Sequence, residues 1–98
     1  MTLFVDPLRR YQHAKPGSRH VFGGGRLSSH LISDENDHTE LLTFATKKLR
    51  MRPEWFQSEH GGHFDLTERK RAVAVRLGAV EVSHQQFSRI IMMKRTIQ

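Results

Sequence analysis

The segment TERKRAVAVRLGAVEVSHQQ, residues 67–86, decides the fold because it marks where a helix, a strand and a second helix begin and end. Thr67 is a typical helix N-cap, and Gly78 stands where a glycine often follows a helix. Residues 79–82 then alternate as a strand does. Ser83 to Gln86 has capping-box spacing, which opens a last helix. This order of elements is typical of an α/β domain.

The sequence before this segment predicts two more strands and one more helix. Thr2 to Val5 is a short apolar run that ends at Asp6-Pro7, as expected of a buried strand stopped by a proline turn. Residues 29–34 predict a second strand, and Asp37 to Glu40 has capping-box spacing for a helix that runs to about Arg50. We therefore expect the 98 residues to form a single small α/β domain, with an at least partly parallel sheet and about three helices.

Helical spacing also predicts which side chains the core buries. Arg89, Lys94 and Arg95 should face solvent or an anion. Trp55 follows a predicted short turn at Pro53 and is most simply a core or lid aromatic, with stacking on a base as the alternative. The expected buried residues are Leu42, Ala45 and Leu49 in the first helix, Ala72, Val73 and Leu77 in the second, and Phe87, Ile90 and Ile91 in the third.

The composition is that of one cytoplasmic domain. A chain of this length buries one modest core, and its 37% hydrophobic and 27% charged residues are ordinary values. No apolar run approaches the roughly 20 residues that span a bilayer, and residues 1–6 do not resemble a signal peptide. Cysteine is absent, which excludes disulfides and thiolate zinc ligands. We expect no membrane contact.

The net charge of +6 favours anionic partners such as nucleic acid, nucleotides or acidic proteins. Small basic proteins also carry such a charge for solubility alone, so both interpretations stay open. The seven histidines gain charge below about pH 6.5, and neutral imidazole is a common metal ligand.

Residues 9–29 predict a long basic loop, because they lack a regular apolar period. Only His20 to Phe22 resembles a short strand. The glycines at 23–25 would let the backbone approach a phosphate closely. Their spacing matches no phosphate-loop motif, and a flexible turn is the simpler interpretation.

Five polar residues stand where predicted strands meet turns. Each could serve structure alone, as a turn cap or as a buried hydrogen-bond partner. Together they predict one polar cleft, built from the end of the first strand, the loop around residues 30–34 and the loop that holds residues 63–65. In an extended chain, two residues that lie two apart, such as His63 and Asp65, place their side chains on one face. The five residues are Asp6, His30, Asp34, His63 and Asp65.

Several sequence blocks carry a resemblance to one family. They are Phe4-Val5-Asp6, Ser29 to Asp34, Glu40 to Ala45, Trp55-Phe56-Gln57, His63-Phe64-Asp65, Arg71 and Leu77 to Val80. In order and spacing they resemble the domain-of-unknown-function family four-zero-three-one, which contains short phage and bacterial proteins. The resemblance implies the fold, the position of the site and a phage or bacterial cytoplasmic setting, but no activity. The family has glycine at Arg50 and tyrosine at Phe64; if that hydroxyl assists chemistry in relatives, this chain would bind without reacting.

The first functional hypothesis is a protein that binds a phosphorylated, nucleotide-type ligand, for example to sequester a host defence signal. Arginine suits bidentate contact with phosphate, and the aspartates would accept hydrogen bonds from ribose or base. The predicted ligand-binding residues are Asp6, Arg9, Arg26, His30, Asp34, Trp55, His63, Asp65 and Arg71.

The second hypothesis is a metal-dependent hydrolase or nuclease that cleaves phosphodiesters. His30, His63 and Asp65 would ligate one divalent ion, with His63 and Asp65 as the candidate catalytic residues. The aspartate could instead orient an imidazole as an outer partner.

A third hypothesis is a basic anti-defence module that binds nucleic acid or a host protein. Its affinity for nucleic acid would fall steeply with salt. A homo-oligomer, in which a second subunit completes the cleft, is compatible with every one of these hypotheses.

Overall fold

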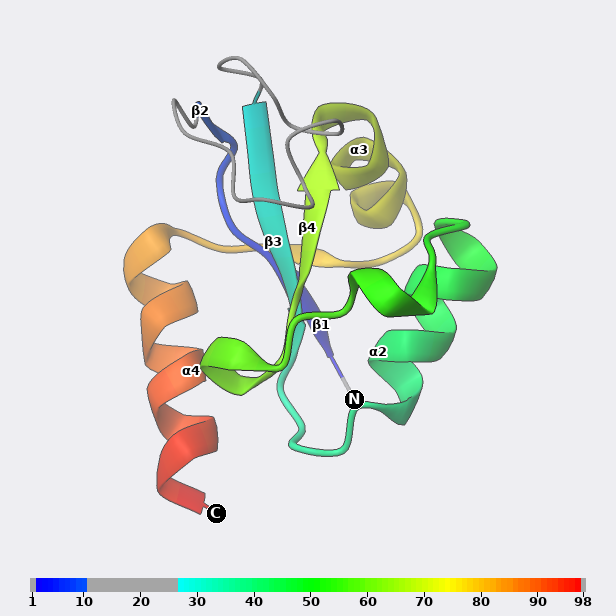
Figure 1. The fold of residues 1–98 in the computed structure, drawn as a ribbon. Coiled ribbons are helices and arrows are strands. Elements are labelled where there is room, and N and C mark those ends of the chain that lie inside the picture. The colour runs from blue at the N-terminus through cyan, green and yellow to red at the C-terminus, as the bar shows by residue number, and fades with distance from the viewer. Residues whose placement is uncertain (1, 11–26, 98) are drawn as a thin grey trace.

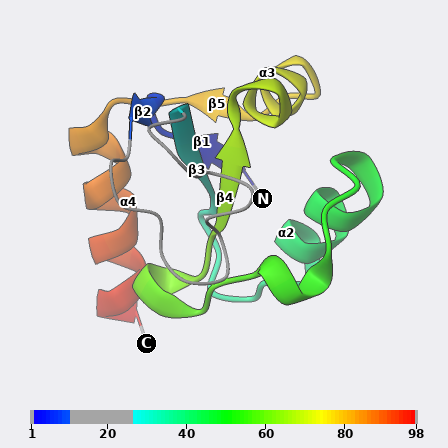
Figure 2. The ribbon, with the colours of Figure 1, turned by 45° about the horizontal axis from the view of Figure 1, so that its top comes forward.

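The fold is a mixed five-stranded sheet with helices on both faces (Figures 1 and 2). The computed structural model describes residues 2–10 and 27–97, with side chains described as far as Lys94. The strands are β1 (Leu3–Val5), β2 (Arg9–Arg10), β3 (Leu27–Ser33), β4 (Phe64–Thr67) and β5 (Val80–Glu81). The helices are α2 (Thr39–Thr43), α3 (Glu68–Arg76) and α4 (His84–Ile97), with a π-helical turn η1 (Phe44–Lys48) and the 3₁₀ turns η2 (Pro53–Trp55) and η3 (Glu59–Gly61).

β3 is the strand that organises the sheet. β4 pairs antiparallel with it along one edge, with His30 opposite Asp65 and Leu31 opposite Phe64. β1 and β2 follow one another along the other edge, because β1 pairs with the end of β3 and β2 with its start. β5 pairs parallel with β1. The expected α/β domain with a partly parallel sheet is therefore confirmed.

The two faces of the sheet bury different kinds of side chain. Figures 1 and 2 show α2 and α3 on one side of the sheet and α4 on the other. Because side chains alternate along a strand, His30 and Asp65 point away from the core and toward the α4 side. The strand residues in the hydrophobic core, packed with α2, η1 and α3, are Leu3, Val5, Leu31, Phe64 and Leu66.

The predicted helix ends in the segment 67–86 are confirmed. The Thr67 hydroxyl accepts a hydrogen bond from the Lys70 backbone N–H at 3.2 Å. Gly78 follows α3 with φ of 112°, a conformation that favours glycine. Ser83 and Gln86 exchange two hydrogen bonds, of 2.9 and 3.1 Å, which complete the capping box.

The helix predicted to run to about Arg50 changes from an α-helix to a π-helical turn at Phe44 and ends at Lys48. The Thr46 hydroxyl donates to the Leu42 carbonyl at 2.8 Å and so occupies an acceptor of the regular helix. The Leu49 N–H instead reaches back five residues to the Phe44 carbonyl, and the chain turns sharply at Arg50, with φ of 55°. The Asp37 carboxylate binds the Thr39 N–H rather than capping at Glu40, and this bond lowers its pKa.

Several burial predictions were wrong for the last two helices. In α3, Ala72 and Leu77 are exposed, Val73 is half-buried and Ala74 takes the fully buried position. In α4, Phe87 is buried and Arg89 exposed as predicted, but Lys94 is only 2% exposed. The cause is a polar partner inside the fold, since the Lys94 ammonium donates to the Gly61 carbonyl at 2.8 Å. Of the first-helix set, Ala45 and Leu49 are buried and Leu42 is half-buried.

Within the range predicted as a basic loop, residues 9–29, β2 occupies Arg9–Arg10 and β3 already begins at Leu27. Residues 11–26, with the predicted strand at 20–22 and Arg26, lie outside the described residues. Among the helices that the structure describes, none is long and apolar enough to cross a membrane.

Ser29 gives a test of the core. Its side chain is fully buried, and its hydroxyl has no hydrogen-bond partner among residues 2–10 and 27–97. We expect Ser29→Ala to raise the free energy of unfolding by about 1 kcal/mol, because a buried unpaired hydroxyl is costly. Ser33→Ala is the matched control, since the equally buried Ser33 hydroxyl accepts from the Glu35 N–H at 3.0 Å. It should lower stability by about 1 kcal/mol. Urea unfolding measures both, and equal losses would contradict the assignment.

Candidate metal centre

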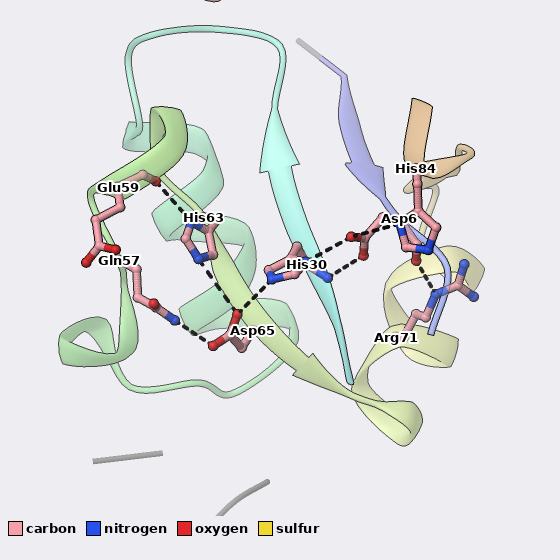
Figure 3. Close-up of polar contacts among 8 residues, drawn as sticks. All are labelled: Asp6, His30, Gln57, Glu59, His63, Asp65, Arg71 and His84. Atoms are coloured by element: carbon pink, nitrogen blue, oxygen red, sulfur yellow. Dashed lines mark hydrogen bonds and ion pairs between the residues drawn. The ribbon is translucent and has the colours of Figure 1, made fainter. Parts of the chain in front are cut away.

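Asp6, His30 and Asp65 form a row across neighbouring strands (Figure 3). Asp6 directly follows β1, and its N–H donates to the His30 carbonyl at 3.3 Å. Asp65 pairs with His30 from the opposite edge of β3. Residues opposite one another on antiparallel strands place their side chains on one face. The sheet itself therefore brings together three residues that are far apart in sequence.

His63 joins this row from the position directly before β4. The predicted loop at residues 63–65 was wrong: Asp65 lies within β4, and His63 forms an isolated β-bridge with Gln57. His30 lies within β3, which confirms the strand predicted over residues 29–34 and replaces the loop expected around residues 30–34. The physical reason is alternation, because the polar His63 and Asp65 face one side while Phe64 faces the core.

The imidazole of His30 is oriented by Asp6. The two carboxylate oxygens of Asp6 bind the His30 backbone N–H at 2.6 Å and the His30 Nδ1 atom at 2.8 Å. A carboxylate accepts, so Nδ1 carries the proton. The other ring nitrogen, Nε2, then lies 3.5 Å from Asp65 Oδ1. This is the arrangement in which an outer carboxylate orients a histidine for a metal.

A backbone carbonyl orients His63 through its Nδ1 atom, as Asp6 orients His30. Its Nδ1–H donates to the Glu59 carbonyl at 3.0 Å, and its Nε2 lies 3.7 Å from Asp65 Oδ1. Burial lowers the pKa of His63, against the opposing effects of the Glu59 hydrogen bond and the Asp65 charge. The side chain is 8% exposed. A neutral imidazole that presents Nε2 is the form that binds metals.

Asp65 completes a group of three ligand atoms. Its Oδ2 accepts a hydrogen bond from the Gln57 side chain at 2.6 Å, which directs Oδ1 toward the two imidazoles. His30, His63 and Asp65 each offer one atom, and these atoms lie within 4.8 Å of one another. Two ligands bound tetrahedrally at about 2.1 Å lie about 3.4 Å apart. The two separations from Asp65 Oδ1, 3.5 Å to His30 Nε2 and 3.7 Å to His63 Nε2, are close to this value.

An arginine and a further histidine lie on the side of this group next to Asp6. Arg71 donates from Nε to the Asp6 carbonyl at 2.9 Å and pairs with Glu81 at 3.0 Å. His84, at the start of α4, lies with Nδ1 4.0 Å from the Asp6 carboxylate. Figure 3 shows both on the far side of Asp6 from His63 and Asp65.

A family model matches residues 18–94, which is most of the chain. The chain belongs to the family described as Protein of unknown function (DUF4031). The match includes His30, His63 and Asp65, while Asp6 precedes it. No curated protein and no solved structure matches the chain.

The other predicted site residues of this DUF4031 chain lie elsewhere. Asp34 is exposed beyond the far end of β3, where its carboxylate accepts from the Thr2 N–H at 3.0 Å. Trp55 packs against the core, with the Arg52 guanidinium 5.9 Å from its ring. Arg9 is exposed on β2, and Arg26 is outside the described residues. The structure therefore brings together four of the five predicted residues, Asp6, His30, His63 and Asp65, without Asp34.

The missing tyrosine hydroxyl at Phe64 does not affect this group of DUF4031 residues. The Phe64 ring is fully buried in the core and lies 5.5 Å from the Phe56 ring. His63 and Asp65 point to the opposite face of the sheet. A hydroxyl on this ring would therefore extend into the core and not toward the imidazoles.

Two of the three outer partners of the site, Gln57 and Glu59, were not predicted from the sequence. The Gln57 amide was noted only as part of a sequence block, and the Glu59 carbonyl has no side-chain signal at all. A detectable signal was the strict alternation of polar and apolar residues from His63 to Leu66, which is typical of a half-buried strand.

Proposed function

We propose that His30 Nε2, His63 Nε2 and Asp65 Oδ1 bind one divalent metal ion, and that the protein uses it to hydrolyse phosphodiesters of nucleotide type. The proposal rests on one observation: in each of the three residues, the polar atom that does not face the proposed ion is hydrogen-bonded. These partners are Asp6 for His30, the Glu59 carbonyl for His63 and Gln57 for Asp65. A group held in this way loses little conformational freedom when a metal binds.

The ligand set limits the choice of metal. Two imidazoles and one carboxylate suit zinc, iron, manganese or nickel better than calcium or magnesium. Three protein ligands leave coordination positions for water and substrate, as in catalytic rather than structural zinc sites. The side chains of His30 and Asp65 are 29% and 23% exposed, so solvent reaches the group from one side.

The proposed chemistry follows from such a centre. A bound metal lowers the pKa of a coordinated water and polarises a phosphoryl oxygen. In this reading His63 and Asp65 act as ligands rather than as a separate acid and base. The support for a phosphate substrate is the net charge of +6, together with Arg71 beside Asp6.

The test is hydrolysis of bis(4-nitrophenyl) phosphate by the metal-free protein after addition of zinc or manganese. We expect metal-dependent release of nitrophenol that a chelator stops and that Asp65→Asn abolishes. His84→Asn is the control, because His84 is not one of the three ligands. Release that survives both chelator and Asp65→Asn would contradict the proposal. Metal-dependent binding of a nucleotide without product would instead support the prediction of a protein that sequesters its ligand.

A further inference from the structure

The buried Lys94 on α4 has a partner that links it to the candidate metal centre. Its side chain is 2% exposed, and Nζ donates to the Gly61 carbonyl at 2.8 Å. Burial lowers the pKa of this lysine, against the opposing charge of Asp34. An ammonium is costly to bury unless it is hydrogen-bonded, so the burial of Lys94 depends on its contact with the Gly61 carbonyl.

The same carbonyl has a second donor. His38, which directly precedes α2, lies with Nε2 3.0 Å from the Gly61 oxygen, and its ring packs 5.0 Å from that of Phe56. A carbonyl can only accept, so the His38 Nε2 carries a proton. The Gly61 carbonyl is therefore held from two sides, by the residue before α2 and by the C-terminal part of α4.

The segment that these donors hold has an unusual backbone. His60, Gly61 and Gly62 have φ of 54°, 83° and 88°. A Cβ atom at Gly62 would lie 2.5 Å from the His38 ring, so the contact requires glycine there. Such a conformation is strained at a non-glycine residue and persists only where surrounding contacts impose it. The two donors to Gly61 are contacts of this kind.

This turn supplies the carbonyl that orients His63. The Glu59 oxygen accepts from His63 Nδ1 at 3.0 Å and from the Gly62 N–H at 3.1 Å, which closes the turn. We infer that Lys94 is a positioning residue: together with His38 it fixes the turn at residues 59–62, and through the Glu59 carbonyl it sets the tautomer and orientation of His63. Its relevance to metal binding rests on the function proposed above.

The decisive variant is Lys94→Met, which keeps an apolar stem and removes the donor. The readout is the tautomer of His63 in the metal-free protein at mildly alkaline pH, from long-range ¹⁵N–¹H correlation spectra of the imidazoles. The unmodified protein should show one tautomer, protonated at Nδ1. In Lys94→Met the ring should exchange between both tautomers, and zinc affinity should fall about 10–100-fold, as for other outer partners of metal ligands.

Lys70→Met is the matched control. The half-buried Lys70 also donates from Nζ to a backbone carbonyl at 2.8 Å, but to Leu49, away from the turn. It should leave both the His63 tautomer and the zinc affinity unchanged, which separates positioning from a general loss of stability.

If Lys94→Met does not fold, His38→Leu removes the other donor to the Gly61 carbonyl and should produce the same mixture of tautomers. A single Nδ1–H tautomer in a folded Lys94→Met or His38→Leu protein would overturn the inference. A changed tautomer in a protein that binds zinc in neither form would confirm the positioning role and contradict the proposed function instead.

Discussion

His63→Asn should reduce the affinity for zinc by more than about 100-fold, beyond the 10–100-fold typical of losing an outer partner. The asparagine amide can still donate to the Glu59 carbonyl, as Nδ1 does, but it has no atom in the position of Nε2. His30→Asn should have the same effect, because it also lacks an atom in the position of Nε2. Its amide can still donate to the Asp6 carboxylate, as Nδ1 does. Isothermal titration of the metal-free proteins with zinc measures the change.

Two further variants should lose less zinc affinity or none. Asp6→Asn replaces one of the two oxygens that accept from His30 with a donor but removes no ligand, so it should cost about 10–100-fold. His84→Asn should bind zinc as the unmodified protein does, because its Nδ1 lies 4.0 Å from Asp6 and outside the three ligands. Circular dichroism should show that all four variants are folded without metal. Zinc affinity that is equal in His63→Asn and His84→Asn would contradict the assignment of ligands.

Phe64→Ala should lower the free energy of unfolding by about 3–5 kcal/mol. The ring is fully buried between the sheet and the helices of the core, and its loss leaves a cavity. Domains of this size have about 5–15 kcal/mol of stability in total, so the variant should be close to unfolding at physiological temperature. Urea unfolding of the metal-free protein gives the value directly.

Leu77→Ala is the comparison for this prediction. Leu77 is 49% exposed at the end of α3, although its spacing predicted burial. It should change stability by no more than about 0.5 kcal/mol, as exposed positions usually do. A loss at Leu77 as large as that at Phe64 would show that the core is packed differently.

Both ends of α3 and the start of α4 could be predicted because local chemistry determines them. Thr67 caps within one turn, Gly78 adopts a backbone conformation that favours glycine, and Ser83 and Gln86 bind each other across three residues. None of these contacts depends on the rest of the fold. The order of elements also predicted that part of the sheet is parallel, and the pairing of β5 with β1 confirms this.

β4 was missed for the opposite reason. Its neighbours Gly61 and Gly62 and its polar residues suggest a loop, but the chain is extended because Phe64 and Leu66 face the core while Asp65 faces the other side. The pairing of His30 with Asp65 across 35 positions is set by the register of two strands, on which the sequence carries no direct signal.

Lys94 shows the same limit. Its position on the predicted helix indicated solvent, and its burial depends on the Gly61 carbonyl, 33 residues away in the chain. Asp34 was grouped with His30 because the two are close in sequence. His30 lies in the middle of the extended strand β3, however, and Asp34 lies beyond its end. Proximity along an extended strand is not proximity in space.

Anomalous diffraction at the zinc edge from crystals grown with zinc tests the central claim most directly. We expect one strong peak within about 2.0–2.2 Å of His30 Nε2, His63 Nε2 and Asp65 Oδ1. Zinc bound only at other histidines, or no peak between these three side chains at saturating metal, would contradict it.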